Sequence, residues 1–93
     1  MPNFLTHVEL RDATPADYQP LNSRMETYGF IRTVQGGDGR THQLPTGTYV
    51  GTGDGTTVQV RELATQAAAE TGKAFGIIVV ECERAAWIGL PTT

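Results

Sequence analysis

The residues with the clearest chemical potential in this 93-residue chain are its two histidines and the acidic residues that follow the first of them. His7 and Glu9 stand two positions apart, and Asp12 comes three positions later. Because histidine titrates near neutral pH, His7 and His42 could act as general acid or base in RNA cleavage through the 2′-hydroxyl group. The alternative is that both are ordinary surface histidines, since no third catalytic partner is evident.

Three arginines could hold phosphate near these residues: Arg11, Arg32 and Arg40. The alternative for each is a solvated charge on a strand or hairpin. The net charge is −3 and the seven basic residues are scattered singly, whereas a domain that grips nucleic-acid backbone usually carries a basic stripe. The charge therefore argues against tight non-specific binding. It remains compatible with an enzyme that contacts RNA briefly, or with a dimer that gathers arginines from two chains.

Other chemistry is not favoured. The glycine-rich loop at residues 51–55 precedes a predicted helix but has no following Lys-Ser/Thr, so a flexible connection is the better interpretation. The one cysteine, Cys82, is expected to be an inert thiol, and no His/Cys cluster has zinc-ligand spacing. No apolar run approaches the ~18–20 residues of a membrane span. With no signal-like N-terminus and no disulfide, we expect a cytoplasmic protein without a membrane partner.

Periodicity and turn signals predict the elements that must position these residues. Apolar and polar residues alternate over 4–10, as in a half-buried strand, and His7 falls on the polar side. Asp38-Gly39 indicates a hairpin turn, and Pro45 interrupts the strand that follows. The predicted elements are a strand at 4–10, a helix from Thr14 to Gly29 that is kinked or begins near Pro20, a strand at 30–35, one strand at 40–43 that continues at 46–51 after Pro45, a helix from Thr56 or Thr57 to Gly72, and a strand at 75–80.

The order strand, helix, strand, strand, helix, strand predicts the α+β class. We expect a single domain over residues 1–93 with a ferredoxin-like βαββαβ sandwich, in which two helices cover one face of a four-stranded antiparallel sheet. The first and third strands would be central. If they pair, His7 and His42 lie on one sheet.

The last strand is apolar on both faces, although the open face of such a sheet is normally polar. It carries Ile78 and Val80, and the C-terminal tail, residues 83–93, adds Trp87, Ile88 and Leu90. We therefore expect the open face to be covered, either by the folded-back tail or by a second copy in a homodimer.

The chain resembles two groups of small ferredoxin-like proteins. A strand ending near an acidic residue, a helix closing on residues 26–30 and then a hairpin are similar to the small endonuclease of CRISPR adaptation. Gly29-Phe30, Asp38-Gly39 and Leu44-Pro45 before a tyrosine-containing strand resemble the GhoS-type antitoxin endoribonucleases. The resemblance covers most of the chain, through short motifs.

In the CRISPR family, an aspartate at the end of the first strand binds a divalent metal at the two-fold axis of a dimer. The resemblance therefore implies a Mg²⁺ site at Asp12, or at Glu9 if the strand ends earlier. Neither residue stands in the family's usual Tyr-Asp dipeptide. The alternative is that Asp12 serves the turn before the helix, since turns favour aspartate.

The sequence supports two hypotheses for the function, which belong to different classes of protein. The first is a cytosolic regulator of the antitoxin or CRISPR-associated endoribonuclease kind, which contacts or cleaves RNA. The second is a non-enzymatic module, for example a phage or mobile-element inhibitor of a defence protein, that binds a partner protein through its open sheet face or edge strand. The acidic charge favours the second, and the resemblance favours the first.

Overall fold

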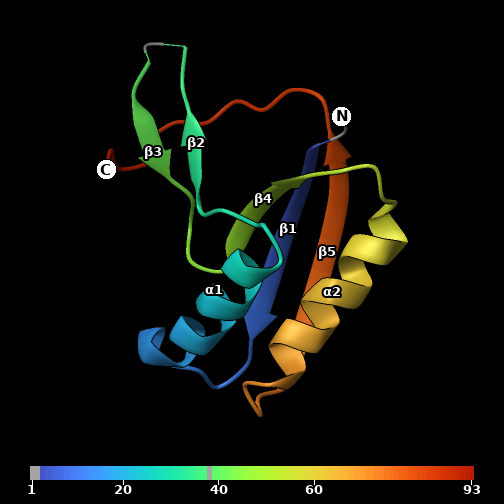
Figure 1. Ribbon diagram of the computed structural model, residues 1–93. Helices are drawn as coiled ribbons and strands as arrows, with labels where there is room; N and C mark the ends of the chain where they lie inside the picture. The colour runs from blue at the N-terminus through green and yellow to red at the C-terminus, as the bar shows by residue number, and fades with distance from the viewer. Residues whose placement is uncertain (1–2, 38) are drawn as a thin grey trace.

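The computed structural model describes residues 3–37 and 39–93. It is an α+β structure with two α-helices and a short 3₁₀ helix, η1 (Figure 1). In chain order its elements are β1 (Asn3–Leu10), η1 (Pro15–Asp17), α1 (Tyr18–Thr27), β2 (Thr33–Gln35), β3 (Thr41–Gln43), β4 (Thr48–Thr52), α2 (Thr57–Ala69) and β5 (Phe75–Cys82). The predicted turn at Asp38-Gly39 is only partly described, because Asp38 lies outside these residues.

The strand β1 is the centre of an antiparallel sheet with the order β4-β1-β5. His7 lies opposite Thr48 on one side and Ile78 on the other. Alternate residues of β1 are buried under the helices, which confirms the predicted alternation: Phe4, Thr6, Val8 and Leu10. Leu5, His7 and Glu9 therefore lie on the opposite side, which we call the open face.

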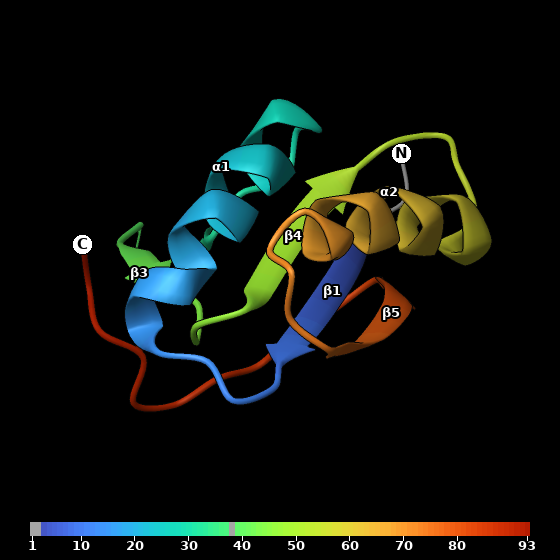
Figure 2. The same cartoon turned by 90° about the horizontal axis from the view of Figure 1, so that it is seen from below.

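Both helices lie on the same side of this sheet (Figure 2). The helix α1 begins at Tyr18, close to Pro20 as the sequence predicted, and it buries Leu21 and Met25. At the start of α2, the Thr56 hydroxyl accepts a hydrogen bond from the Gln59 backbone N–H at 3.2 Å, which confirms Thr56 as the N-cap. The apolar side chains from β1, the two helices and Tyr49 form one buried core.

The predicted four-stranded sheet is wrong. Among the described residues, the main sheet has three strands, and β2 and β3 form a separate two-stranded sheet. The link between the two parts is a single bridge, in which Ile31 and Val50 exchange two backbone hydrogen bonds of 2.8 Å. The β2–β3 hairpin projects away from the helices and from β1 (Figure 1).

The physical reason lies in the turn between β3 and β4. The Thr48 N–H donates to the Pro45 carbonyl at 3.0 Å, and Gly47 has a φ of +84°. The chain therefore reverses between the two strands that the sequence predicted as one interrupted strand. As a result β4 pairs with β1, and β3 pairs with β2.

The C-terminal tail runs from β5 to the hairpin on the side of the sheet away from the helices (Figures 1 and 2). The Gln43 N–H donates to the Pro91 carbonyl at 2.8 Å, and the Thr93 N–H donates to the Thr41 carbonyl at 3.0 Å. The tail thus adds to the edge of β3. It leaves Ile78 and Val80 exposed by 60% and 42%, so it does not cover the whole open face.

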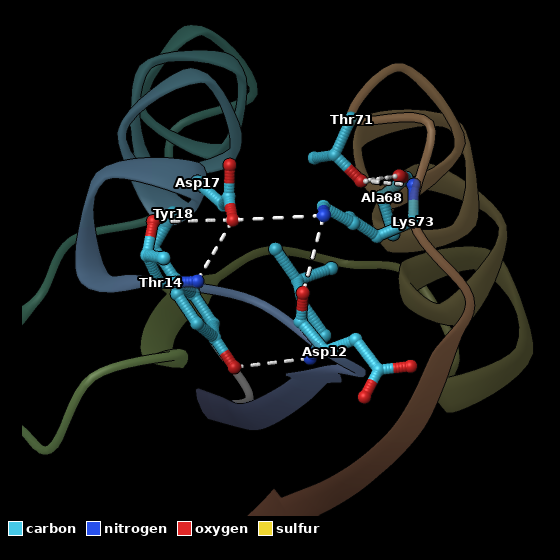
Figure 3. Close-up of polar contacts among 8 residues, drawn as sticks. Asp12, Thr14, Asp17, Tyr18, Ala68, Thr71 and Lys73 are labelled. Atoms are coloured by element: carbon cyan, nitrogen blue, oxygen red, sulfur yellow. Dashed lines mark hydrogen bonds and ion pairs between the residues drawn. The ribbon is translucent and has the colours of Figure 1, made fainter.

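A polar network closes the end of the domain where β1 exits and β5 begins (Figure 3). The Lys73 ammonium lies between the Asp12 carbonyl, at 3.1 Å, and the Asp17 carboxylate, at 3.8 Å. The Asp17 carboxylate also accepts from the Thr14 backbone N–H at 2.7 Å. The network ties the loop after β1 to the loop between α2 and β5.

We expect this network to make stability depend on acidic pH. The Thr14 backbone N–H, more than Lys73, holds the pKa of Asp17 below its ordinary value of 3.8. The stabilisation is therefore fully present above pH 3.8 and is lost as pH falls through the lowered pKa. In urea unfolding, Asp17→Asn should be less stable than wild type at pH 7, and the difference should shrink below pH 3.8. Lys73→Met should keep most of this pH dependence; losing all of it would contradict the assignment to Thr14.

Tyr49 should give a second pH-dependent contribution, at the alkaline end. Its side chain is fully buried, and its hydroxyl donates to Asn22 Oδ1 at 2.5 Å. Burial raises the pKa of Tyr49 from 10.0 to about 12, so stability should fall as pH rises through this range. We expect Tyr49→Phe to cost about 1 kcal/mol at pH 7 and to remove that alkaline loss.

The matched control is Tyr28→Phe, because the Tyr28 hydroxyl makes a longer, exposed bond of 3.3 Å to Gln66. Its cost should be within ~0.5 kcal/mol. Urea titrations at pH 7 and pH 11 measure both variants. Equal costs for the two would show that burial of Tyr49 is not the source of the effect.

Candidate functional site

The candidate site is the open face of β1 and its continuation, which carries His7, Glu9 and Arg11. The buried neighbours Val8 and Leu10 point under the helices, so these three side chains share the other side of the strand. Successive residues on one face of a strand are ~6.6 Å apart. The arrangement therefore offers an imidazole, a carboxylate and a guanidinium in a row.

Strand pairing holds His7 in place. Its Nδ1 atom lies 3.0 Å from the Thr48 hydroxyl oxygen on β4. This contact exists because the turn at Gly47 sets the register in which Thr48 stands opposite His7. The sequence gives no signal for Thr48 as a partner, since its position depends on which strand β4 joins. With Nδ1 engaged, the Nε2 atom is the ring nitrogen left to meet a ligand.

Glu9 and Arg11 are more exposed than His7. The Arg11 Nε atom lies 3.9 Å from Glu9 Oε1, and the two side chains are 61% and 66% exposed. Arg11 also lies over β5, because a Cβ atom added to Gly76 would be 3.8 Å from its Nη2 atom. A pair this exposed contributes little to stability, so both groups are accessible to a ligand.

Asp12 is set apart from this row by the backbone. It has a φ of +51°, which an aspartate adopts in turns, and its carbonyl rather than its carboxylate meets Lys73. Figure 3 shows the Asp12 carboxylate pointing away from Asp17 and Lys73. Across residues 3–37 and 39–93, no group of three or more His, Cys, Asp or Glu residues could hold a metal ion. The Mg²⁺ site implied for Asp12 thus has no ligand cluster around it.

The second histidine belongs to the other sheet. His42 pairs with Val34 in the β2–β3 hairpin, not with β1, so the two histidines do not share a sheet. Its Nδ1 atom lies 3.2 Å from the Leu90 carbonyl oxygen, and its ring centroid lies 5.8 Å from that of Trp87. Through these contacts His42 holds the C-terminal tail against the hairpin.

The other two arginines also lie away from β1. Arg32 precedes β2, where its Nη2 atom lies 3.5 Å from Glu26 Oε1. Its Nε atom is buried without a hydrogen-bond partner. Arg40 lies in the hairpin loop, where its carbonyl accepts from the Gly36 N–H at 2.8 Å. Of the predicted phosphate-binding arginines, Arg11 shares the face of His7 and Glu9 and lies beside Glu9, whereas Arg32 and Arg40 lie away from this face.

The predicted interface residues divide into two groups. Ile78 and Val80 are exposed on the open face of β5, and Ile88 on the tail is 95% exposed. Trp87 and Leu90 are half-buried and line a groove of about 610 Å³ between tail, hairpin and sheet. The apolar wall of this groove on the sheet side consists mainly of Leu5, Ile31 and Val50.

The fold and the site define a small α+β domain with a three-stranded antiparallel sheet, one face of which is open and partly apolar. No family model matches this chain, and a comparison with curated proteins also finds no match. In the part of the chain that the structure describes, no helix is long and apolar enough to cross a membrane.

Proposed function

We propose that the chain cleaves RNA without a metal ion, at the open face of β1. The observation that carries the proposal is that His7, Glu9 and Arg11 occupy one accessible side of the central strand, clear of the tail contacts at the hairpin. General acid–base catalysis of RNA cleavage needs a proton acceptor, a proton donor and a positive charge near the phosphate. These three side chains are of those types.

Each group has a role in the proposed reaction. Glu9 accepts the proton of the ribose 2′-hydroxyl, and the 2′-oxygen forms a bond to phosphorus. The bond from phosphorus to the 5′-oxygen breaks, and protonated His7 supplies a proton to that oxygen. Arg11 stabilises the charge on the non-bridging phosphate oxygens. The products are a 2′,3′-cyclic phosphate and a free 5′-hydroxyl. The net charge of −3 predicts weak RNA affinity.

The test is incubation of the full chain with end-labelled single-stranded RNA, in EDTA and in Mg²⁺. We expect equal cleavage in both conditions and products that end in 2′,3′-cyclic phosphate. A substrate with one 2′-deoxy position should resist cleavage at that position. The proposal is wrong if wild type does not cleave at high protein concentration, or if EDTA abolishes the cleavage.

A second candidate, a protein-binding module without catalysis, is favoured by the apolar part of the same face. The groove beside Trp87 and the exposed Ile31, at 53%, would suit an apolar segment of a partner protein. This function predicts no RNA cleavage. It also predicts a partner complex that Leu5→Glu disrupts at the groove and that Glu9→Gln leaves intact.

A further inference from the structure

The strand β5 stands at the edge of the sheet but has the composition of a central strand. Its first six residues, 75–80, contain no charged residue and no proline, although natural edge strands are usually protected by such residues. Ile78 and Val80 are exposed on the open face, while Ile77 and Val79 are half-buried under α2. Strands that are apolar on both sides normally have neighbours on both edges.

The direction of the backbone groups on β5 follows from its pairing with β1. The Arg11 N–H donates to the Ala74 carbonyl at 2.9 Å, and backbone groups alternate in direction along a strand. The backbone N–H and C=O groups of even-numbered residues of β5 therefore bond to β1. Those of odd-numbered residues point away from β1, toward the free edge. In the part of the chain that is described, the sheet ends at β5. The outward N–H and C=O groups belong to Phe75, Ile77, Val79 and Glu81.

We propose that β5 pairs in antiparallel fashion with β5 of a second copy, so that two three-stranded sheets form one continuous sheet. One register lets all four outward residues bond: Phe75 lies opposite Glu81 of the second copy, and Ile77 lies opposite Val79. The two-fold axis then passes between the two Ile78 side chains, on the open face. Since each copy uses its β5 edge once, the assembly closes as a dimer.

The sequence of β5 favours a second copy as the occupant of this edge. Glu83 follows the end of β5, and Lys73 precedes its start. The Lys73 ammonium also contacts the Asp12 carbonyl and the Asp17 carboxylate of its own copy. In the register described, Glu83 of each copy stands opposite Lys73 of the other, at both ends of the paired strands. At the centre of this register, Ile77 faces Val79 and Ile78 faces Ile78 of the second copy, while Phe75 faces Glu81 nearer the ends. The apolar centre of the strand is therefore complementary to itself.

The dimer would also extend the candidate site. His7 lies opposite Ile78 within one copy, so the two His7 residues would be three strand spacings apart, ~14 Å. Both rows of His7, Glu9 and Arg11 would lie on one open surface. The dimer itself does not depend on RNA cleavage.

The test is the mass of the full chain in solution, by sedimentation equilibrium from micromolar to millimolar concentration. We expect wild type to reach twice the chain mass of 10.0 kDa. Ile78→Lys should raise the dissociation constant roughly tenfold or more, because two lysines would stand opposite each other. The matched control is Ile88→Lys, which changes another exposed isoleucine and should dimerise as wild type does.

A charge swap tests the two-fold contact directly. Ile78→Lys and Ile78→Glu should each dimerise more weakly than wild type alone and should form a mixed dimer when combined. Circular dichroism of each variant checks that it is folded, and Ile78 tolerates both changes in the monomer because it is 60% exposed. The proposal is overturned if wild type stays monomeric at millimolar concentration, if Ile78→Lys dimerises normally, or if the mixture does not associate.

Discussion

Replacing Gly47 with alanine is expected to destabilise the protein by roughly 4 kcal/mol or more. The Cβ atom of an alanine there would lie 2.4 Å from the Val8 carbonyl oxygen and 3.2 Å from the Tyr18 ring. Contacts this short with backbone cannot be relieved by a side-chain rotation. The positive φ of +84° adds ~1–2 kcal/mol for any residue with a Cβ atom. A domain of this size has a total stability of only ~5–15 kcal/mol.

Gly72→Ala is the matched control, because it separates the two costs. Gly72 has a similar φ of +74°, but an added Cβ atom would have nothing within 4 Å. Its cost should therefore be the conformational term alone, ~1–2 kcal/mol. Urea unfolding at pH 7 measures both variants. If they lose the same stability, then the close approach of Gly47 to β1 is not what requires glycine.

Gly47 also bears on the candidate site. The Val8 N–H donates to the Gly47 carbonyl at 2.8 Å, and the next residue, Thr48, contacts His7. Movement of this turn away from β1 would therefore withdraw the partner of the imidazole. If Gly47→Ala folds at low temperature, we expect its RNA cleavage to be reduced along with its stability.

The second large effect is expected for His7→Ala, which should lower the rate of RNA cleavage by about a hundredfold or more. General acid–base groups typically contribute ~10²–10⁴-fold. The fold should survive, because His7 is half-buried on the open face and Thr48 keeps its place in β4. Thr48→Val should give a smaller, several-fold loss, since the imidazole stays but loses its 3.0 Å contact.

The matched control is His42→Ala, which removes the other histidine of the chain. His42 lies in the β2–β3 hairpin and contacts the tail, so its loss should change the cleavage rate by less than about twofold and should loosen the tail. Single-turnover cleavage with saturating protein measures the three variants. Equal losses for His7→Ala and His42→Ala would contradict the placement of catalysis on β1.

Much of the local structure could be predicted from the sequence. The alternation along β1, the start of α1 near Pro20 and the Thr56 cap of α2 each depend on residues close together in the chain. Period-two burial and helix caps are local properties, so they are visible before the fold is known. His7 and Glu9 were placed on the side away from the helices for the same reason.

The place of the β2–β3 hairpin could not be predicted in this way. Pro45 marked an interruption, but whether the chain continued in the same sheet or turned depended on Gly47 fitting against the Val8 carbonyl. That contact joins residues far apart in sequence. It sends β3 into a separate hairpin, moves His42 away from His7 and leaves the tail to pair with β3. The four-stranded sheet was therefore wrong, although each predicted strand segment overlaps with a strand of the structure.

The sequence by itself thus determined the elements and the faces of β1, because both follow from the spacing of side chains along one strand or helix. Only the tertiary structure decided that Thr48 supports His7, that Arg11 lies over Gly76, and that β2 and β3 leave the main sheet. Each of these depends on which strands pair and in what register. Register is set by turns and by contacts across the fold, and a one-residue change in it would reverse every face.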